Sequence, residues 1–262
     1  MYKFRDINEE QDTGFNIPKE SILINGEHME ELIEGFRTLT VTGRELVNRS
    51  IESVKIEGRD GSLYLGSNLE PRTLKVRYLL EAEDEGDFRD KFNLMNQILQ
   101  SPQMEIRFND ELEYYYIGTL SKVGEVPRGR NVVTSEFEIY CSDGYKYSDP
   151  MELSGSNEVE MSIETPYRTL PVEIEVTPEN DTDTITIINS DKEIRLVGGS
   201  FVGGSPVSIV FGDEIVVNSA NGDDTDKVAL NSDLEDFEIK NGDTVQFVEG
   251  GNIEILVSKV MI

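Results

Sequence analysis

Apolar residues that alternate with polar ones recur along this chain of 262 residues and restrict it to folds built largely from strands. In residues 72–80 the apolar side chains are expected to share one face, which consists of Leu74, Val76, Tyr78 and Leu80. The basic residues Arg72, Lys75 and Arg77 are expected to lie off that face. Such period-two alternation is typical of a half-buried strand. It predicts three more strands, at residues 104–108, 113–120 and 132–141, with an exposed loop between the last two. Two runs around Asp60-Gly61 predict a hairpin, because glycine accepts the positive φ of its turn.

Residues 87–102 have the spacing of a helix instead. Apolar residues recur there every three or four positions, which predicts one apolar stripe on a helix of about four turns. The stripe consists of Phe88, Phe92, Met95 and Leu99, flanked by Ile98. Asp87 is placed to cap the N-terminus, and Ser101-Pro102 ends the helix. We expect the stripe to pack against the sheet.

From residue 171 onwards the chain consists of short β-rich runs separated by Asn, Asp and Gly. Strands are expected within residues 171–178, 183–189, 192–199, 205–212, 213–219, 226–232, 235–242, 243–250 and 252–260. This spacing, without a helical stretch, predicts a β-sandwich or jelly roll. The glycine pairs Gly198-Gly199 and Gly203-Gly204 are interpreted as tight turns.

The net charge and the residue composition both change near residue 150. Residues 1–149 carry 18 basic and 29 acidic side chains, whereas residues 150–262 carry 6 and 23, so the net charges are −11 and −17. A segment rich in Ser, Gly, Pro and acidic residues covers about residues 148–168. We predict a mainly β chain with two domains: a β-rich α+β domain with one amphipathic helix at 1–150, and an all-β sandwich at 151–262.

The net charge of −28 makes ordinary adhesion to nucleic acid unfavourable, because phosphate binding needs Lys and Arg to replace counterions. The sequence offers no stretch of apolar residues for a membrane span and no apolar signal-peptide core, so we expect folding in a cytoplasm and no membrane partner. The single Cys141 is expected to be a buried apolar side chain near a strand end.

No set of catalytic residues emerges from the sequence. The only histidine, His28, stands beside Glu27 and Glu30 and is more typical of a surface or loop residue than of a metal ligand. Residues 221–226 are rich in Asp but lack the spacing of a calcium loop. We therefore predict no enzyme, no metal site and no cofactor.

Five motifs in a fixed order carry a resemblance to a known family. They are a turn with GRDG (58–61), PRTLKV (71–76), an acid-led helix DFRDKFNLMN (87–96), the strand YYYIGTL (114–120) and the end CSDGYKY (141–147). Together they make residues 20–148 resemble the N-terminal region of distal tail (Dit) proteins of long-tailed bacteriophages and related phage-tail-like particles. The remaining residues match that family only in general character.

The resemblance implies a virion structural protein at the distal end of a tail, assembled in the cytoplasm of a bacterial host. The N-terminal domain is then expected to form a ring, a hexamer or double hexamer, that joins the tail tube protein to the tail-associated tip protein. DNA would pass through the ring without specific binding. The C-terminal domain is expected to be a galectin-like sandwich that can carry receptor-binding proteins.

A closed ring would repeat each lumen-facing carboxylate by symmetry, and such a lining would repel DNA phosphates over a Debye length of about 8 Å. As an alternative function we consider a carbohydrate- or host-surface-binding sandwich, and as a third a tail-associated hydrolase. The candidate residues for a subunit interface are Arg72, Arg77, Arg89 and Tyr115. The arginines could pair with carboxylates of a neighbour, and one of three consecutive tyrosines must leave the local core.

Overall fold

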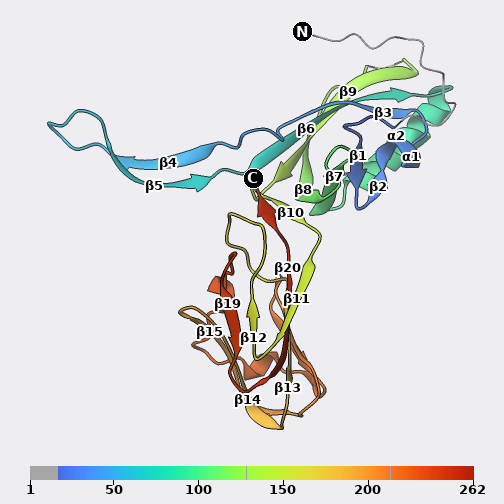
Figure 1. Cartoon of the computed structure of the whole chain (residues 1–262). Helices are drawn as coiled ribbons and strands as arrows, with labels where there is room; N and C mark the ends of the chain where they lie inside the picture. The colour runs from blue at the N-terminus through green and yellow to red at the C-terminus, as the bar shows by residue number, and fades with distance from the viewer. Residues whose placement is uncertain (1–16, 128, 213) are drawn as a thin grey trace. The chain divides into compact units, whose positions relative to one another are not determined.

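The computed structural model describes residues 17–127, 129–212 and 214–262 (Figure 1). These residues form two compact units. The first unit contains residues up to Leu112 together with Tyr116–Gly144, and the second contains Glu113–Tyr115 and Tyr145–Ile262. Antiparallel strands dominate both units, so the mainly β fold predicted from the alternation is confirmed.

The first unit holds two helices and most of one extended sheet. Its elements are β1 (Ile22–Ile24), β2 (Glu27–His28), α1 (Met29–Leu32), β3 (Phe36–Thr42), β4 (Arg49–Val54), β5 (Leu63–Leu69), β6 (Arg72–Glu81), α2 (Glu85–Leu99), β7 (Met104–Phe108), β8 (Tyr114–Val123) and β9 (Val132–Cys141). The sheet runs in the order β2-β1-β7-β8-β9-β6-β3, whereas β4 and β5 form a separate two-stranded sheet.

Helix α2 packs one face against this sheet, as its apolar stripe predicts. Met95 and Leu99 are buried in the core of the unit, and Phe88, Phe92 and Ile98 pack against it. The cap predicted at Asp87 is wrong. Asp84 is the N-cap, and its Oδ1 accepts hydrogen bonds from the main-chain amides of Gly86 and Asp87 at 2.8 and 2.9 Å. The helix therefore begins three residues earlier than the apolar pattern indicates.

Strand β6 corrects the placement of one basic residue. Arg72 has the same alternation as Leu74 and Val76, and it lies on their buried face with 3% of its surface exposed. Lys75 and Arg77 lie off that face, as predicted. A buried arginine is tolerated here because main-chain carbonyl oxygens accept hydrogen bonds from its guanidinium.

The second unit contains strands and short 3-10 turns. Its elements are β10 (Lys146–Ser148), β11 (Met151–Ser156), β12 (Glu158–Glu160), β13 (Glu173–Pro178), β14 (Thr182–Asn189), β15 (Lys192–Phe201), β16 (Val207–Val210), β17 (Val216–Ser219), β18 (Gly222–Asp223), η1 (Thr225–Lys227), η2 (Leu234–Asp236), β19 (Thr244–Phe247), β20 (Gly251–Val257) and β21 (Val260–Met261). Two sheets result, ordered β11-β20-β13-β16-β17-β18 and β12-β19-β14-β15.

Both sheets contribute alternate residues to one core. Ile174 and Val176 on β13 and Ile253 and Ile255 on β20 belong to the same buried cluster as Ile185 on β14. A shared core between two antiparallel sheets is the β-sandwich that the spacing of the runs predicts.

Two sets of predictions for this unit are wrong, namely two of the strands and one glycine turn. Residues 226–232 and 235–242 form 3-10 turns and isolated bridges instead of strands. Gly198-Gly199 lies within β15, next to an irregularity in its pairing with β14, and not in a tight turn. The Ser- and Gly-rich segment after residue 150 contains β11 and β12, one in each sheet of the sandwich.

Candidate assembly surfaces

The β4–β5 hairpin is the most exposed element of the first unit. Its register runs from Arg49 opposite Leu69 to Val54 opposite Leu63, with one irregularity after Glu52. Every residue of β4 is exposed, and no residue of β5 is buried. Figure 1 shows the hairpin extending away from the other strands of its unit. It is therefore an arm that its own unit does not cover.

The arm exposes an unusual amount of apolar surface. Its exposed apolar residues and their relative accessibilities are Ile51 (68%), Val54 (48%), Ile56 (41%), Leu63 (47%), Tyr64 (62%) and Leu65 (58%). An isolated two-stranded hairpin is marginally stable in water, and a large exposed apolar patch usually marks a surface that binds another protein. The arm is therefore a candidate surface for binding another molecule.

Polar side chains make cross-strand contacts within the arm. The Ser67 hydroxyl lies 3.0 Å from the Tyr64 hydroxyl and accepts a hydrogen bond from Arg49 Nε at 3.1 Å, which places these three side chains together. The Asn68 amide donates to the Glu52 carboxylate at 3.4 Å. These contacts keep the two strands in register without burying the apolar residues.

Two connections, residues 43–48 and 70–71, join the arm to the rest of its unit and are called its root. Arg72 binds the first of them. Its guanidinium donates hydrogen bonds to the carbonyl oxygens of Gly43 (2.9 Å) and Glu45 (3.4 Å), and a third to Gly144 (3.3 Å). The guanidinium carbon also lies 5.3 Å from the centre of the Tyr116 ring. Arg72, predicted as an interface residue, thus makes its contacts inside the first unit.

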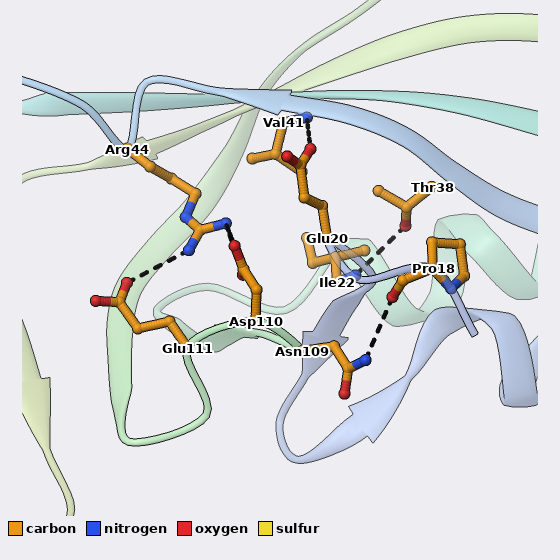
Figure 2. A network of polar contacts seen from close by, with 9 residues as sticks. All are labelled: Pro18, Glu20, Ile22, Thr38, Val41, Arg44, Asn109, Asp110 and Glu111. Atoms are coloured by element: carbon orange, nitrogen blue, oxygen red, sulfur yellow. Dashed lines mark hydrogen bonds and ion pairs between the residues drawn. The ribbon is translucent and has the colours of Figure 1, made fainter. Parts of the chain in front are cut away.

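Arg44 lies in the root and contacts residues at the end of β7 in the same unit (Figure 2). Its guanidinium pairs with Asp110 at 2.8 Å and Glu111 at 3.4 Å, and its central carbon lies 4.4 Å from the centre of the Phe108 ring. Burial acts to lower the pKa of Arg44, but Asp110, Tyr116 and Glu111 together outweigh burial and raise this pKa. The guanidinium is therefore a fixed positive charge. Sequence reasoning missed this residue.

The same region ties the first described residues to the sheet (Figure 2). The Asn109 amide donates to the Pro18 carbonyl at 3.3 Å, and the Glu20 carboxylate accepts from the Val41 amide at 3.3 Å. The Ile22 amide donates to the Thr38 hydroxyl, also at 3.3 Å. These bonds fix the chain before β1 against β3 and the turn after β7.

The three other predicted interface residues lie on three different elements. Arg77 is exposed on the outer face of β6, opposite Glu136 in the pairing with β9. Arg89 is exposed on α2. Tyr115 is half-buried in the second unit, where β8 pairs with β10, and its ring lies 6.0 Å from that of Tyr147.

Arg89 lines a groove of about 590 Å³ along helix α2. The helix side is formed by Glu85, Phe88, Arg89, Phe92, Asn93 and Asn96, and the opposite side by Val126, Pro127, Gly129, Arg130 and Asn131. The rings of Phe88 and Phe92 lie 5.3 Å apart, so the groove has apolar groups between polar and basic ones. It is a second surface of the first unit, distinct from the arm in residues and chemistry.

A serine, a histidine and a carboxylate meet near the start of the described chain. Ser21 Oγ lies 2.9 Å from His28 Nδ1 and donates to Glu30, whose other oxygen accepts from the Thr38 amide. Ser21 and Glu30 are buried, and the carboxylate binds the serine instead of orienting the imidazole. A buried serine and a carboxylate that does not contact the imidazole differ from a catalytic triad, and the contacts serve to hold β1, α1 and β3 together.

Two other groups behave as structural residues. Cys141 is fully buried, and burial raises the pKa of its thiol to about 12. Asp223 accepts a hydrogen bond from the Thr225 amide, and Asp224 accepts one from the Ser219 hydroxyl.

Across the described ranges no group of three His, Cys, Asp or Glu side chains could hold a metal ion. Within the same ranges no helix is long and apolar enough to span a membrane.

Comparison with known proteins yields one family and several solved structures. Residues 25–141 match the family described as "phage tail protein RIFT-related domain". The Dit protein of phage SPP1, described as a hub adsorption apparatus of phages that infect Gram-positive bacteria, has a TM-score of 0.74 and 19% identity. That match covers 92% of this chain and 99% of the SPP1 protein.

A chain of the phage p2 baseplate in its activated conformation is also similar, with a TM-score of 0.53 and 8% identity. It covers 85% of this chain and 90% of the baseplate chain. No curated protein sequence matches the chain. The resemblance to distal tail proteins inferred from the five motifs is confirmed. Residues 25–141 are thus similar to the phage tail RIFT-related domain, and the chain as a whole has the fold of the SPP1 distal tail (Dit) protein.

Proposed function

We propose that this chain is a structural subunit of a phage tail tip or baseplate, forming a ring that joins the tail tube to the tail-tip proteins. The ring is a hexamer or double hexamer, stands at the distal end of the tail and is assembled in the bacterial host. The observation that carries the proposal is the β4–β5 arm, whose apolar residues have no cover in their own unit.

A ring built from one kind of subunit needs two unlike surfaces on each copy, because rotation brings one surface against the other. The arm supplies the first. For the second we propose the groove along α2, in which Arg89 and Arg130 stand beside the Phe88–Phe92 pair. The aliphatic residues of the arm could pack on the two rings, and the arm carboxylates Glu52 and Glu57 could pair with the two arginines.

Measurement of the mass in solution tests the ring. The wild-type chain is expected to have six or twelve times its mass of 29.5 kDa. The triple variant Val54→Ser, Leu63→Ser, Leu65→Ser is expected to be monomeric, because it removes apolar surface from the arm alone. A matched control is Val197→Ser, Val202→Ser, Val248→Ser, which changes three exposed valines of the second unit. A monomeric wild type, or an arm variant that assembles like the control, would contradict the proposal.

Cross-linking tests the pairing of arm and groove. One chain carries Ser53→Cys on the arm, and another carries Asn93→Cys on the groove wall. When the two are mixed and oxidised, a disulfide is expected between different chains. The matched control pairs Ser53→Cys with Ser154→Cys, an exposed position on β11 of the second unit. A cross-link as strong with the control would show that the groove is not the acceptor.

DNA passage through the ring is part of the same proposal. The acidic excess of the chain supports an opening that repels phosphates, although the larger share, a net −17, belongs to residues 150–262. A map of the assembled ring tests this idea, since a neutral or basic central surface would contradict it.

The carbohydrate-binding alternative has little support in the second unit. Among the aromatic side chains that the sequence offers there, Phe201, Phe237 and Phe247 are buried in the core. Phe211 packs against that core, and Tyr167 lies with its ring 5.3 Å from that of Tyr145. Sugar rings bind to exposed aromatic faces, so the assembly role is preferred.

A further inference from the structure

We infer that Arg44 and Arg72 together fix the direction in which the β4–β5 arm leaves the first unit. The two residues act as positioning residues: they hold the root of the arm, so that its apolar surface is presented in one orientation before a partner binds. The orientation is inferred from the root contacts alone, and only its purpose, contact with a neighbouring subunit, rests on the proposed function.

Packing of its strands contributes little to the orientation of the arm, because among their described residues only Leu69, at the end of β5, packs against another part of the unit, at Gly144. All residues of β4 are exposed, so no buried side chain of that strand ties it to a fixed direction. Two connections join the arm to the unit, residues 43–48 after β3 and Glu70-Pro71 before β6. The Glu70 amide donates to the Asn48 carbonyl at 3.0 Å and closes the base of the arm. That bond joins the two connections to each other but does not by itself fix the closed base relative to β3 and β6.

Arg72 removes part of this freedom because it contacts both connections. It follows Pro71 directly in the chain, and its side chain binds the carbonyl oxygens of Gly43 and Glu45 in the other connection. The third bond, to Gly144, extends the contact to the end of the first unit. The planar guanidinium donates in several fixed directions, so one side chain can hold three carbonyls in one arrangement.

Arg44 supplies a contact in another direction. It stands between the two residues whose carbonyls Arg72 binds, yet its side chain reaches Phe108, Asp110 and Glu111 at the end of β7. One attachment would let the root rotate about it, whereas two attachments to different elements fix its direction. The Arg44 side chain is 17% exposed and Phe108 is buried, which strengthens the contact with the ring, whereas Asp110 is exposed.

A spin-label distance measurement tests this inference directly. The labels are attached at Ser53→Cys on the arm and Lys122→Cys on β8, both exposed positions of the first unit. The native thiol of Cys141 is buried and stays unlabelled. Labelled chains are diluted with unlabelled wild-type chains, so that only distances within one chain are observed.

We expect one narrow distance distribution in the otherwise unchanged chain. Arg44→Ala and Arg72→Lys are expected to lose the single peak and give a broad distribution, while Arg44→Lys, which keeps the charge toward Asp110, partly restores it. Arg59→Ala, at the exposed turn of the arm, is the matched control and should leave the peak unchanged. Thermal unfolding of each variant checks that the unit remains folded, which matters most for the buried Arg72.

Unchanged narrow peaks in the folded arginine variants would overturn the inference, whatever happens to the ring. Broad distributions with an unchanged ring mass would support the positioning role and count against the arm as the assembly surface. Broad distributions together with loss of the ring would support both. If Arg72→Lys does not fold, Arg44→Ala and its Lys counterpart still decide the question.

Discussion

Glu175 on β13 lies directly opposite Glu254 on β20, so that two carboxylates face each other across neighbouring strands of the larger sheet. Burial is the main cause that raises the pKa of Glu175, and the charges of Glu254, Glu173 and Glu152 add to it. Like charges in directly opposed positions destabilise a sheet. The sandwich is therefore less stable at neutral pH than its apolar core alone would allow.

Replacing Glu254 with Gln should stabilise the second unit at pH 7 by a few tenths to about 1 kcal/mol, because it removes the opposed charge. Since the folded-state pKa of Glu175 is raised, protonation relieves the repulsion as the pH falls through that pKa. The gain should therefore shrink toward acidic pH. Urea unfolding at several pH values measures it. Glu160→Gln, an exposed position with the same charge change, should show no such gain. Equal effects of the two variants would contradict this explanation.

The cap of helix α2 gives a second prediction. Asp84→Ala removes the acceptor of two main-chain amides and should lower the stability of the first unit by about 1 kcal/mol. Asp90→Ala, an exposed position on the same helix, removes the same charge and should cost only a few tenths of a kcal/mol. Urea unfolding followed by the helical circular dichroism signal compares the two. A larger loss for Asp90→Ala would mean that charge, and not capping, dominates.

Gly43 at the root of the arm gives a third prediction. Its φ is +92°, and a Cβ added there would lie 2.0 Å from the carbonyl oxygen of Thr73. Gly58 has a similar φ of +78° but open space around it. Gly58→Ala should therefore cost about 1 kcal/mol for its backbone conformation alone, whereas Gly43→Ala should cost more than about 3 kcal/mol. Thermal unfolding of both variants checks this, and similar losses would show that the backbone at Gly43 can move aside.

The parts of the fold predicted well are those in which one local pattern decides the outcome. Strands β7 and β9 have the bounds that alternation predicts, because alternate residues along each strand are buried in one core. The run at 226–232 also alternates, yet Leu230 is fully exposed and only Val228 makes a bridge. These residues have no continuous partner strand, which a strand of a sheet needs. A strand depends on its neighbour as much as on its own sequence.

The candidate surfaces were harder to predict, since contacts distant in sequence create them. Arg72 looked like a surface residue because it is charged, but it is buried by contacts with residues 29 and 72 positions away in the chain. Arg44 gave no signal at all, since its partners Asp110 and Glu111 follow a later strand. The hairpin itself was predicted from Asp60-Gly61. Local sequence does not show whether the apolar residues of a hairpin will pack against the rest of their own unit.

Cys141 gives the last prediction. Burial raises the pKa of its thiol to about 12, from an ordinary value of 9.0, and the nearby charge of Arg72 only partly opposes this. Because the thiolate is the reactive form, a thiol reagent at pH 8 should leave the folded chain unmodified and react with one thiol after denaturation. The raised pKa also has a thermodynamic consequence. Between pH 9 and 12 the unfolded chain loses this proton while the folded chain keeps it, so the thiol's contribution to stability falls as the pH rises. Cys141→Ser should remove the labelling in denaturant. Rapid labelling of the folded wild type would show that the first unit opens at β9 and that the thiol is not held in a closed core.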